Sequence, residues 1–270
     1  MSNVNYSNLW DKRGRLSYYY KNEQFYTIGP VPHYYQRRKK LLAYLDRVLE
    51  PYNKKEEEQT LLDFGCGDGY YLDYIRKKFP NLKLYGCDLS APMLERAEKM
   101  VEGEAELCLA DGEVPFERTF DVIIAIGVLG VIVDDDRVKE LYQDIYNHLR
   151  PGGQFITFDA VANVRRGTEK WTRRTEDWYR DAGQNAGLEL EDKYMIAYPL
   201  YERFHKYIGR HIKARYERRP DYTGIELNKN WFFLRTVELM IALSPVFPFS
   251  LIPVKEGNCV FLYRKQGGSE

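Results

Sequence analysis

The feature that most constrains this chain is a regular alternation of short apolar runs with amphipathic segments across residues 60–158. The apolar runs are strand-length, and the segments between them repeat their apolar residues at helical spacing. The runs lie at 60–64, 82–87, 106–110, 120–126 and 154–158, and the helical segments at 69–79, 92–101 and 135–149. Repeated strand–helix units predict a parallel sheet with helices on both faces, so we predict an α/β, doubly wound fold.

The flanking segments predict further elements. A helix is expected at 36–49, ended by Pro51, and a turn at 150–153 before the fifth strand. Thr175 is a candidate N-cap for a helix ending at Gly187, and strands are expected at 188–197 and 258–264.

These elements divide the chain into four parts. We predict an N-terminal lid and helical segment (1–50), a Rossmann-like core (51–197), a helical insert (198–257), and the last strand with its tail (258–270). The insert holds a basic amphipathic helix near 201–218 and an apolar helix near 230–243.

The first predicted strand runs into the glycine-rich sequence DFGCGDG at 63–69. Glycines after a strand allow a ligand to approach the backbone at a helix N-terminus, although a tight turn needs glycines for steric reasons as well. The dinucleotide pattern GxGxxG requires glycine at position 70, where this chain has Tyr70. A GxGxG loop of this kind suits a ligand without phosphates.

Two aspartates follow the next two strands. Asp88 ends the second strand and is placed to accept hydrogen bonds from both hydroxyls of a ribose, or else to cap the next helix. Asp111, with Gly112, follows the third strand, where it either binds an adenine amino group or forms an Asp-Gly turn.

Taken in order, these motifs closely resemble the class I S-adenosylmethionine (SAM)-dependent methyltransferases, above all their small-molecule branch. The resemblance covers about 60–265 and includes CDLSAPMLERA, ADGEVPF…FDVIIAIGVL and LRPGGQF. It implies a seven-stranded, mostly parallel sheet whose last strand is antiparallel, and SAM as the cofactor. In such enzymes, segments before the first strand fold over SAM as a lid.

The resemblance also implies roles for individual residues. Asp63 belongs to the glycine motif, the loop glycines approach the amino-acid part of SAM, and Asp88 holds the ribose. The remaining residues flank the adenine, bind its edge or border the methyl group. The complete set is Asp63, Gly65, Gly67, Gly69, Asp88, Leu89, Met93, Asp111, Gly112 and Ile126.

The sequence gives less information about catalysis. The fourth strand ends at Ile126 without a carboxylate, so we predict that no metal is bound, unlike in catechol-type enzymes. His33, Tyr26 and His205 are candidate catalytic residues, because a hydroxyl or acidic carbon acceptor needs a base. Packing and surface roles remain the alternatives for all three.

The charge composition of the chain limits the classes of partner that it is expected to bind. With 40 basic and 40 acidic residues the chain lacks the basic excess of a nucleic-acid binder, so no nucleic-acid partner is expected. The basic stretch at 201–219 is either a solvated face or a site for an anionic acceptor or membrane surface. No secretory signal or apolar span is visible, and four unpaired cysteines fit a cytoplasmic protein.

We therefore predict metal-independent methyl transfer, by in-line displacement in a closed pocket, to the oxygen, nitrogen or carbon of a small molecule in biosynthesis. The acceptor is expected to be anionic or partly apolar, and the enzyme a monomer or homodimer. The alternatives are a methyltransferase for a lipid- or glycan-linked envelope intermediate, a methyltransferase for RNA or protein, and a SAM-binding protein that does not transfer methyl.

Overall fold

The computed structural model describes residues 18–20, 23–25, 30–168, 171–208, 230–246 and 248–267. These residues divide into two compact units. Unit 1 comprises 1–12, 45–195 and 258–270, and unit 2 comprises 13–44 and 196–257. Helix α2 (Val31–Asn53) passes from unit 2 into unit 1. None of the described helices is both long and apolar enough to cross a membrane.

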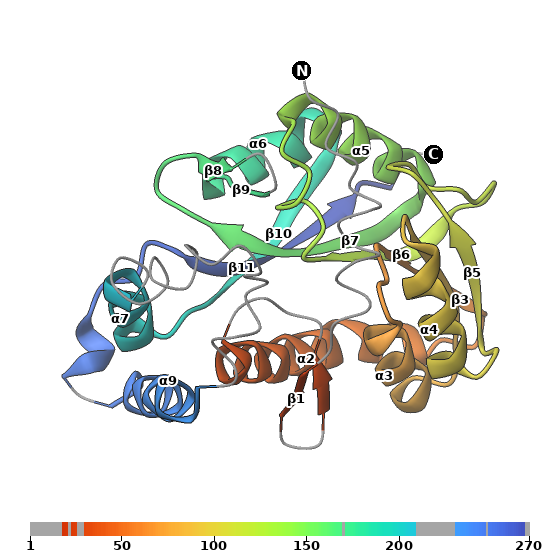
Figure 1. Ribbon diagram of the computed structural model, residues 1–270. Coiled ribbons are helices and arrows are strands. Elements are labelled where there is room, and N and C mark those ends of the chain that lie inside the picture. The colour runs from red at the N-terminus through yellow and green to blue at the C-terminus, as the bar shows by residue number, and fades with distance from the viewer. Residues whose placement is uncertain are drawn as a thin grey trace. The chain divides into compact units, whose positions relative to one another are not determined.

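Unit 1 is built on a seven-stranded sheet with the order β10-β11-β7-β6-β3-β4-β5. Its strands are β3 (Gln59–Phe64), β4 (Leu82–Asp88), β5 (Ala105–Leu109), β6 (Phe120–Ile126), β7 (Leu149–Val161), β10 (Leu188–Ile196) and β11 (Gly257–Lys265). The pairs β3–β4, β3–β6, β4–β5 and β6–β7 are parallel. The arrow of β11 points against that of β7 in Figure 1, so the predicted antiparallel last strand is confirmed.

Helices cover both faces of this sheet. They are α3 (Tyr70–Lys78), α4 (Ala91–Val101), α5 (Asp135–His148) and α6 (Glu176–Asn185). Figure 1 shows α3 and α4 on one face and α5 and α6 on the other. Strand β3 is buried along its whole length, as expected for a central strand covered on both sides. The predicted doubly wound α/β fold is therefore confirmed.

The switch in strand order lies between β3 and β6. From β3 the chain continues to β4 and β5 on one side, whereas β6 and β7 lie on the other side. In an open α/β sheet, ligands bind beyond the carboxyl ends of the strands at this point. A ligand site is therefore expected at the loops that follow β3 and β6.

The structure corrects two predicted boundaries. The first helix extends from Val31 to Asn53 and includes Pro51, rather than covering 36–49. A proline near the start of a helix loses no hydrogen bond, so Pro32 does not delay the helix. The predicted turn at 150–153 instead forms part of β7, with a shift in register where Phe120 pairs with Leu149 and Val122 with Gln154. Arg150 holds this irregular stretch by donating to the Asp121 carboxylate at 2.9 Å.

Other elements match the predictions or add to them. Thr175 caps α6 by accepting from the Trp178 amide at 3.1 Å, although α6 ends at Asn185 and not at Gly187. Unit 1 also contains a short hairpin, β8 (Arg166–Thr168) with β9 (Trp171–Arg173), that the sequence did not predict.

Unit 2 contains α7 (Pro199–Ile208), α9 (Trp231–Leu243) and a short 3-10 helix, η3 (Phe249–Leu251). Asn230 caps α9 by accepting from the Phe233 amide at 3.0 Å, which confirms the predicted apolar helix. Of the predicted basic helix, residues 209–218 lie outside the described residues. A two-stranded sheet, β1 (Tyr18–Tyr20) with β2 (Glu23–Phe25), forms part of the segment predicted as a helical lid.

Candidate functional site

The glycine loop connects β3 to α3, at the carboxyl end of the central strand. Gly65, Gly67 and Gly69 have φ values of +75°, +58° and +80°, all in the left-handed region that favours glycine. The amides of Gly65 and Cys66 both donate to the Cys87 carbonyl, at 2.8 and 2.9 Å. The loop is thereby fixed to the end of the neighbouring strand β4.

The three glycines serve different purposes. A Cβ on Gly65 would lie 2.5 Å from Cγ2 of Val128, and one on Gly69 would lie 2.9 Å from Cα of Ala97. Close packing of the protein itself therefore requires glycine at these two positions. A Cβ on Gly67 would meet only Cε of Met93, at 3.7 Å. Protein packing leaves room at Gly67, as expected where a ligand approaches the backbone.

Asp88 ties the glycine loop to the next helix. Its Oδ2 accepts from the Gly67 amide at 2.9 Å, and its Oδ1 accepts from the Ser90 amide at 2.9 Å. Ser90, not Asp88, occupies the N-cap position of α4. Each carboxylate oxygen has a further lone pair, so Asp88 retains the capacity to accept from two hydroxyls. Burial raises the pKa of Asp88, although the backbone hydrogen bonds oppose the rise.

Asp63 contributes a second, more deeply buried carboxyl group to this loop. Its Oδ2 is buried and has no hydrogen-bond partner among the described residues. Burial raises its pKa to about 8, and the charges of Asp88 and Asp68 add to the rise. An acidic group that no cation among the described residues neutralises fits a site for a positively charged ligand.

The other predicted SAM-binding residues meet at the same edge of the sheet, because β3, β4, β5 and β6 are parallel. Met93 is buried in the first turns of α4, whereas Leu89 and Ile126 are half-buried at the ends of β4 and β6. Asp111 and Gly112 follow β5 and are exposed. Gly112 has a φ of +88°, so the Asp-Gly turn weighed as an alternative role is present there.

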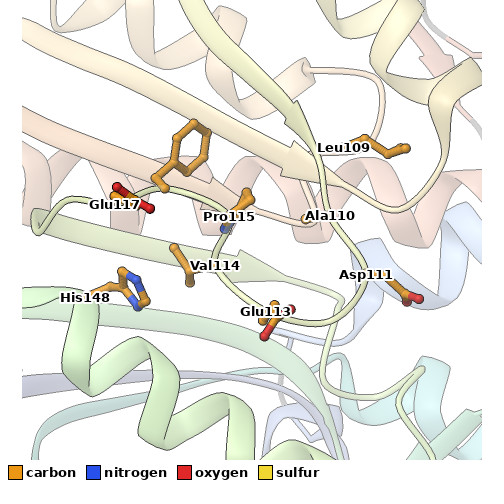
Figure 2. Close-up of a pocket in the computed structure, with 9 residues that line it drawn as sticks. Leu109, Ala110, Asp111, Glu113, Val114, Pro115, Glu117 and His148 are labelled. Carbon is orange, nitrogen blue, oxygen red and sulfur yellow. The ribbon is translucent and has the colours of Figure 1, made fainter.

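A cavity of about 320 Å³ lies beside this turn (Figure 2). It is formed by the chain between Leu109 and Glu117 together with His148 at the end of α5. No lining residue comes from the glycine loop or from the end of β4. Of the two residues predicted to bind the adenine edge, Asp111 lines the cavity and Gly112 does not, and the cavity is separate from the glycine loop.

The candidate catalytic residues belong to unit 2. His33 is buried in the first turn of α2, where it stacks on Tyr201 with ring centroids 4.2 Å apart. Its Nε2 lies 3.7 Å from the Glu202 carboxylate. The ammonium of Lys40 lies over the Tyr198 ring at 4.5 Å, and burial lowers the pKa of Lys40. Tyr26 and the side chain of His205 lie outside the described residues.

Metal ligands are not gathered anywhere in the described part of the chain, where no three His, Cys, Asp or Glu side chains are placed to hold an ion. Asp159, near the end of β7, is instead used internally. It accepts from the Gly130 amide at 2.8 Å and from the Thr157 hydroxyl at 3.0 Å, and burial raises its pKa to about 6.

Sequence reasoning missed Val128 and Arg174. Val128 lies against Gly65, and the buried Arg174 bonds to the loop that carries Val128. Val128 is one apolar residue in an apolar run, and Arg174 is one of several arginines in the charged stretch before α6. Only the tertiary structure gives either residue a role.

Comparison with known proteins finds a family match for residues 62–155, described as a methyltransferase domain. The chain is 32% identical over 109 residues to malonyl-[acyl-carrier protein] O-methyltransferase of Halalkalibacterium halodurans, covering 38% of this chain and 39% of that protein. It is 30% identical over 128 residues to tRNA (carboxymethyluridine(34)-5-O)-methyltransferase of Arabidopsis thaliana, covering 44% and 30%. The chain thus spans less than half the length of the curated relatives it matches.

Among solved structures, the chain is similar to the O-methyltransferase from a trans-AT polyketide synthase multienzyme of Brevibacillus brevis in complex with S-adenosyl-L-homocysteine. The TM-score is 0.54 at 19% identity, over 77% of this chain and 67% of that chain. At this identity the likeness concerns the fold alone. The matched family segment includes the glycine loop, Asp88 and Val128.

Proposed function

Since this chain belongs to the class I SAM-dependent methyltransferases, we propose that it transfers the methyl group of SAM to a small-molecule acceptor. The observation that carries the proposal is the pairing of Asp88 with the Gly67 amide at 2.9 Å, beside the switch in strand order. A carboxylate and an uncrowded glycine backbone at this point are the groups that a nucleoside ligand needs.

The residues present fit SAM. Asp88 accepts from the ribose hydroxyls, Leu89 and Met93 flank the adenine, and Asp111 with Gly112 binds its edge. The carboxyl of Asp63 is buried directly before the loop that approaches the amino-acid end. Its pKa is raised to about 8, so a cationic ligand that binds beside it would favour its ionisation. Bound SAM supplies a methyl group that is activated by its positively charged sulfur. The protein's share is to hold donor and acceptor in line and to exclude water.

We further propose that no metal takes part. The support is the donor set: β6 ends at Ile126 without a carboxylate, and Asp159 is already committed to Gly130 and Thr157. Turnover that is lost in EDTA and restored by magnesium would contradict this part of the proposal.

His33 is our candidate for the general base. The Glu202 carboxylate lies 3.7 Å from its Nε2, where it can stabilise the imidazolium that forms when a general base takes up a proton. Replacing His33 with Asn should lower turnover strongly and leave the affinity for SAM unchanged. A loss of SAM binding in this variant would mean that His33 has a structural role.

The acceptor class follows from two considerations. The balanced charge of the chain argues against a long polyanion, although three similar proteins are named as tRNA methyltransferases. The acyl-carrier-protein O-methyltransferase favours a carboxylate-bearing acceptor. We therefore favour a small acid or a related metabolite.

An acceptor attached to a lipid is the second candidate, because unit 2 exposes large apolar side chains. Trp231 and Phe232 at the start of α9 are 69% and 75% exposed. Exposed neighbouring aromatics are typical of surfaces that contact apolar partners. Co-sedimentation with anionic vesicles would favour this candidate.

The deciding experiment has two stages. Calorimetry with S-adenosyl-L-homocysteine first tests cofactor binding, with Asp88→Ala as the control that should bind more weakly. A screen of carboxylate, amine and phenol metabolites, bulk tRNA and lipid extracts then scores the release of S-adenosyl-L-homocysteine from SAM. Binding without release from any pool would favour a SAM-binding protein that transfers no methyl group.

A further inference from the structure

The loop that follows β6, residues 127–134, is a second wall of the proposed SAM site. β6 pairs in parallel with β3, so the ends of both strands and the loops after them are neighbours. The contact is close, because a Cβ on Gly65 would lie 2.5 Å from Cγ2 of Val128. The position of Val128 therefore limits the conformation available to the glycine loop.

Arg174 binds this loop through hydrogen bonds to its backbone. Its side chain is fully buried, and its Nη1 and Nη2 each donate at 2.7 Å, to the carbonyls of Leu129 and Ile132. Its Nε donates to the Asp135 carboxylate, also at 2.7 Å. The guanidinium is planar, so these acceptors must lie in fixed directions to satisfy it. Burying the Arg174 cation costs desolvation free energy unless these hydrogen bonds form. A loop conformation that breaks them is therefore disfavoured.

Two further bonds hold Gly130, which lies between the carbonyls bound by Arg174. The Gly130 amide donates to Asp159 at 2.8 Å, and the Gly130 carbonyl accepts from the Thr172 amide at 2.7 Å. The amides of Gly127 and Val131 are bonded as well, to the carbonyls of Phe158 and Val128. The loop is thus held by several hydrogen bonds to other groups of unit 1.

We propose that Arg174 is a positioning residue for the SAM site. It holds residues 129–132 so that Val128 lies against Gly65, and the wall of the site is formed before SAM binds. Arg174 itself does not touch the ligand. The inference rests on the proposed function, because it takes the glycine loop as the place where SAM binds.

The test compares Arg174→Lys with a matched control, Arg165→Lys. Arg165 contacts the same loop through the Val133 carbonyl and also pairs with Asp135, but its side chain is 51% exposed. Lysine keeps the charge and loses the planar fork. We expect Arg174→Lys to weaken binding of S-adenosyl-L-homocysteine roughly tenfold at a temperature where it is folded, and Arg165→Lys to change it less than twofold.

Hydrogen exchange supplies a readout that does not depend on the cofactor. In the ligand-free wild type, the amides of Gly127, Gly130 and Val131 should already be protected, and Arg174→Lys should expose them more than Arg165→Lys does. If these amides are unprotected in the free wild type and gain protection only with S-adenosyl-L-homocysteine, the proposal is overturned, even if Arg174→Lys does not fold. Wild-type affinity and loop protection in a folded Arg174→Lys overturn it too.

Failure of the proposed function gives a different result. In that case the wild type does not bind S-adenosyl-L-homocysteine at all, whereas the exchange comparison still reports whether Arg174 holds the loop.

Discussion

Unit 1 and unit 2 differ in the contacts that stabilise each of them internally. In unit 1, side chains bond to backbone groups at fixed points: Asp88 to the Gly67 amide, and Arg174 to two loop carbonyls. In unit 2, side chains stack on one another at His33 and Tyr201, and large apolar side chains such as Phe232 remain exposed.

The difference has a physical consequence. Bonds between side chains and backbone fix the path of the chain, so unit 1 tolerates few changes near its glycine loop. Ring contacts are less directional and can be repacked with other side chains. We infer that unit 1 supplies the cofactor chemistry and that unit 2 is where acceptor selectivity can change. The predictions below test this contrast, from the largest expected effect to the smallest.

Gly69 is a position in unit 1 where both backbone conformation and packing oppose any larger residue. Alanine there combines a φ of +80° with a Cβ only 2.9 Å from Cα of Ala97, and backbone cannot move aside easily. We expect Gly69→Ala to lower the free energy of unfolding by about 2–5 kcal/mol, measured by urea denaturation. Gly103 is the matched control, with a φ of +77° and no atom within 4 Å of a Cβ. Gly103→Ala should cost only about 1–2 kcal/mol. Equal losses would show that packing at Gly69 is unimportant.

The second prediction concerns pH and Asp63. Its pKa rises from 3.8 in the unfolded chain to about 8 in the folded protein. Between these values the folded state binds the extra proton, so the stabilisation is fully present below pH 4 and is lost as pH rises toward 8. The wild type should lose about 3 kcal/mol between pH 5 and pH 7 relative to Asp63→Asn, at 1.4 kcal/mol per pH unit. Parallel pH profiles for the two proteins in urea denaturation would refute the assignment.

Asp88 tests the cofactor role of unit 1 directly. Asp88→Ala should weaken SAM binding by roughly 1–3 kcal/mol, because charge-assisted bonds to the ribose are lost. The matched change in unit 2 is Glu202→Ala, which removes a carboxylate next to His33 and should leave SAM affinity unaltered. Calorimetry on both folded variants measures their affinity for SAM and tests both expectations. Unchanged affinity in Asp88→Ala contradicts the site, and weakened affinity in Glu202→Ala contradicts the division between the units.

The smallest effects come from the helix caps. Thr175 caps α6 in unit 1 and Asn230 caps α9 in unit 2. Replacing either with Ala should cost about 1 kcal/mol, whereas Thr175→Ser and Asn230→Asp retain the cap. Hydrogen exchange should increase only in the unit that carries the change. An increase that extends through both units would show that they unfold together.

Much of the fold could be predicted from the sequence because local rules determine it. The buried strand 120–126 was predicted with the bounds that β6 has, and the predicted cap at Thr175 follows from side-chain chemistry. The errors occurred where tertiary contacts override local preference. The stretch 150–153 has the composition of a turn, yet Arg150 binds Asp121 and holds it in β7.

For the site, the sequence by itself determined the glycine loop, the aspartate at the end of β4 and their shared edge of the sheet. Chain order and the parallel crossover rule bring these groups together whatever the side chains around them are. Only the tertiary structure decided which glycine is left open for a ligand and that Arg174 bonds to the loop carrying Val128. It also decided that Oδ2 of Asp63 is buried with no hydrogen-bond partner among the described residues. The reason is that burial and unpaired charge depend on neighbours distant in the chain, and a linear pattern does not record them.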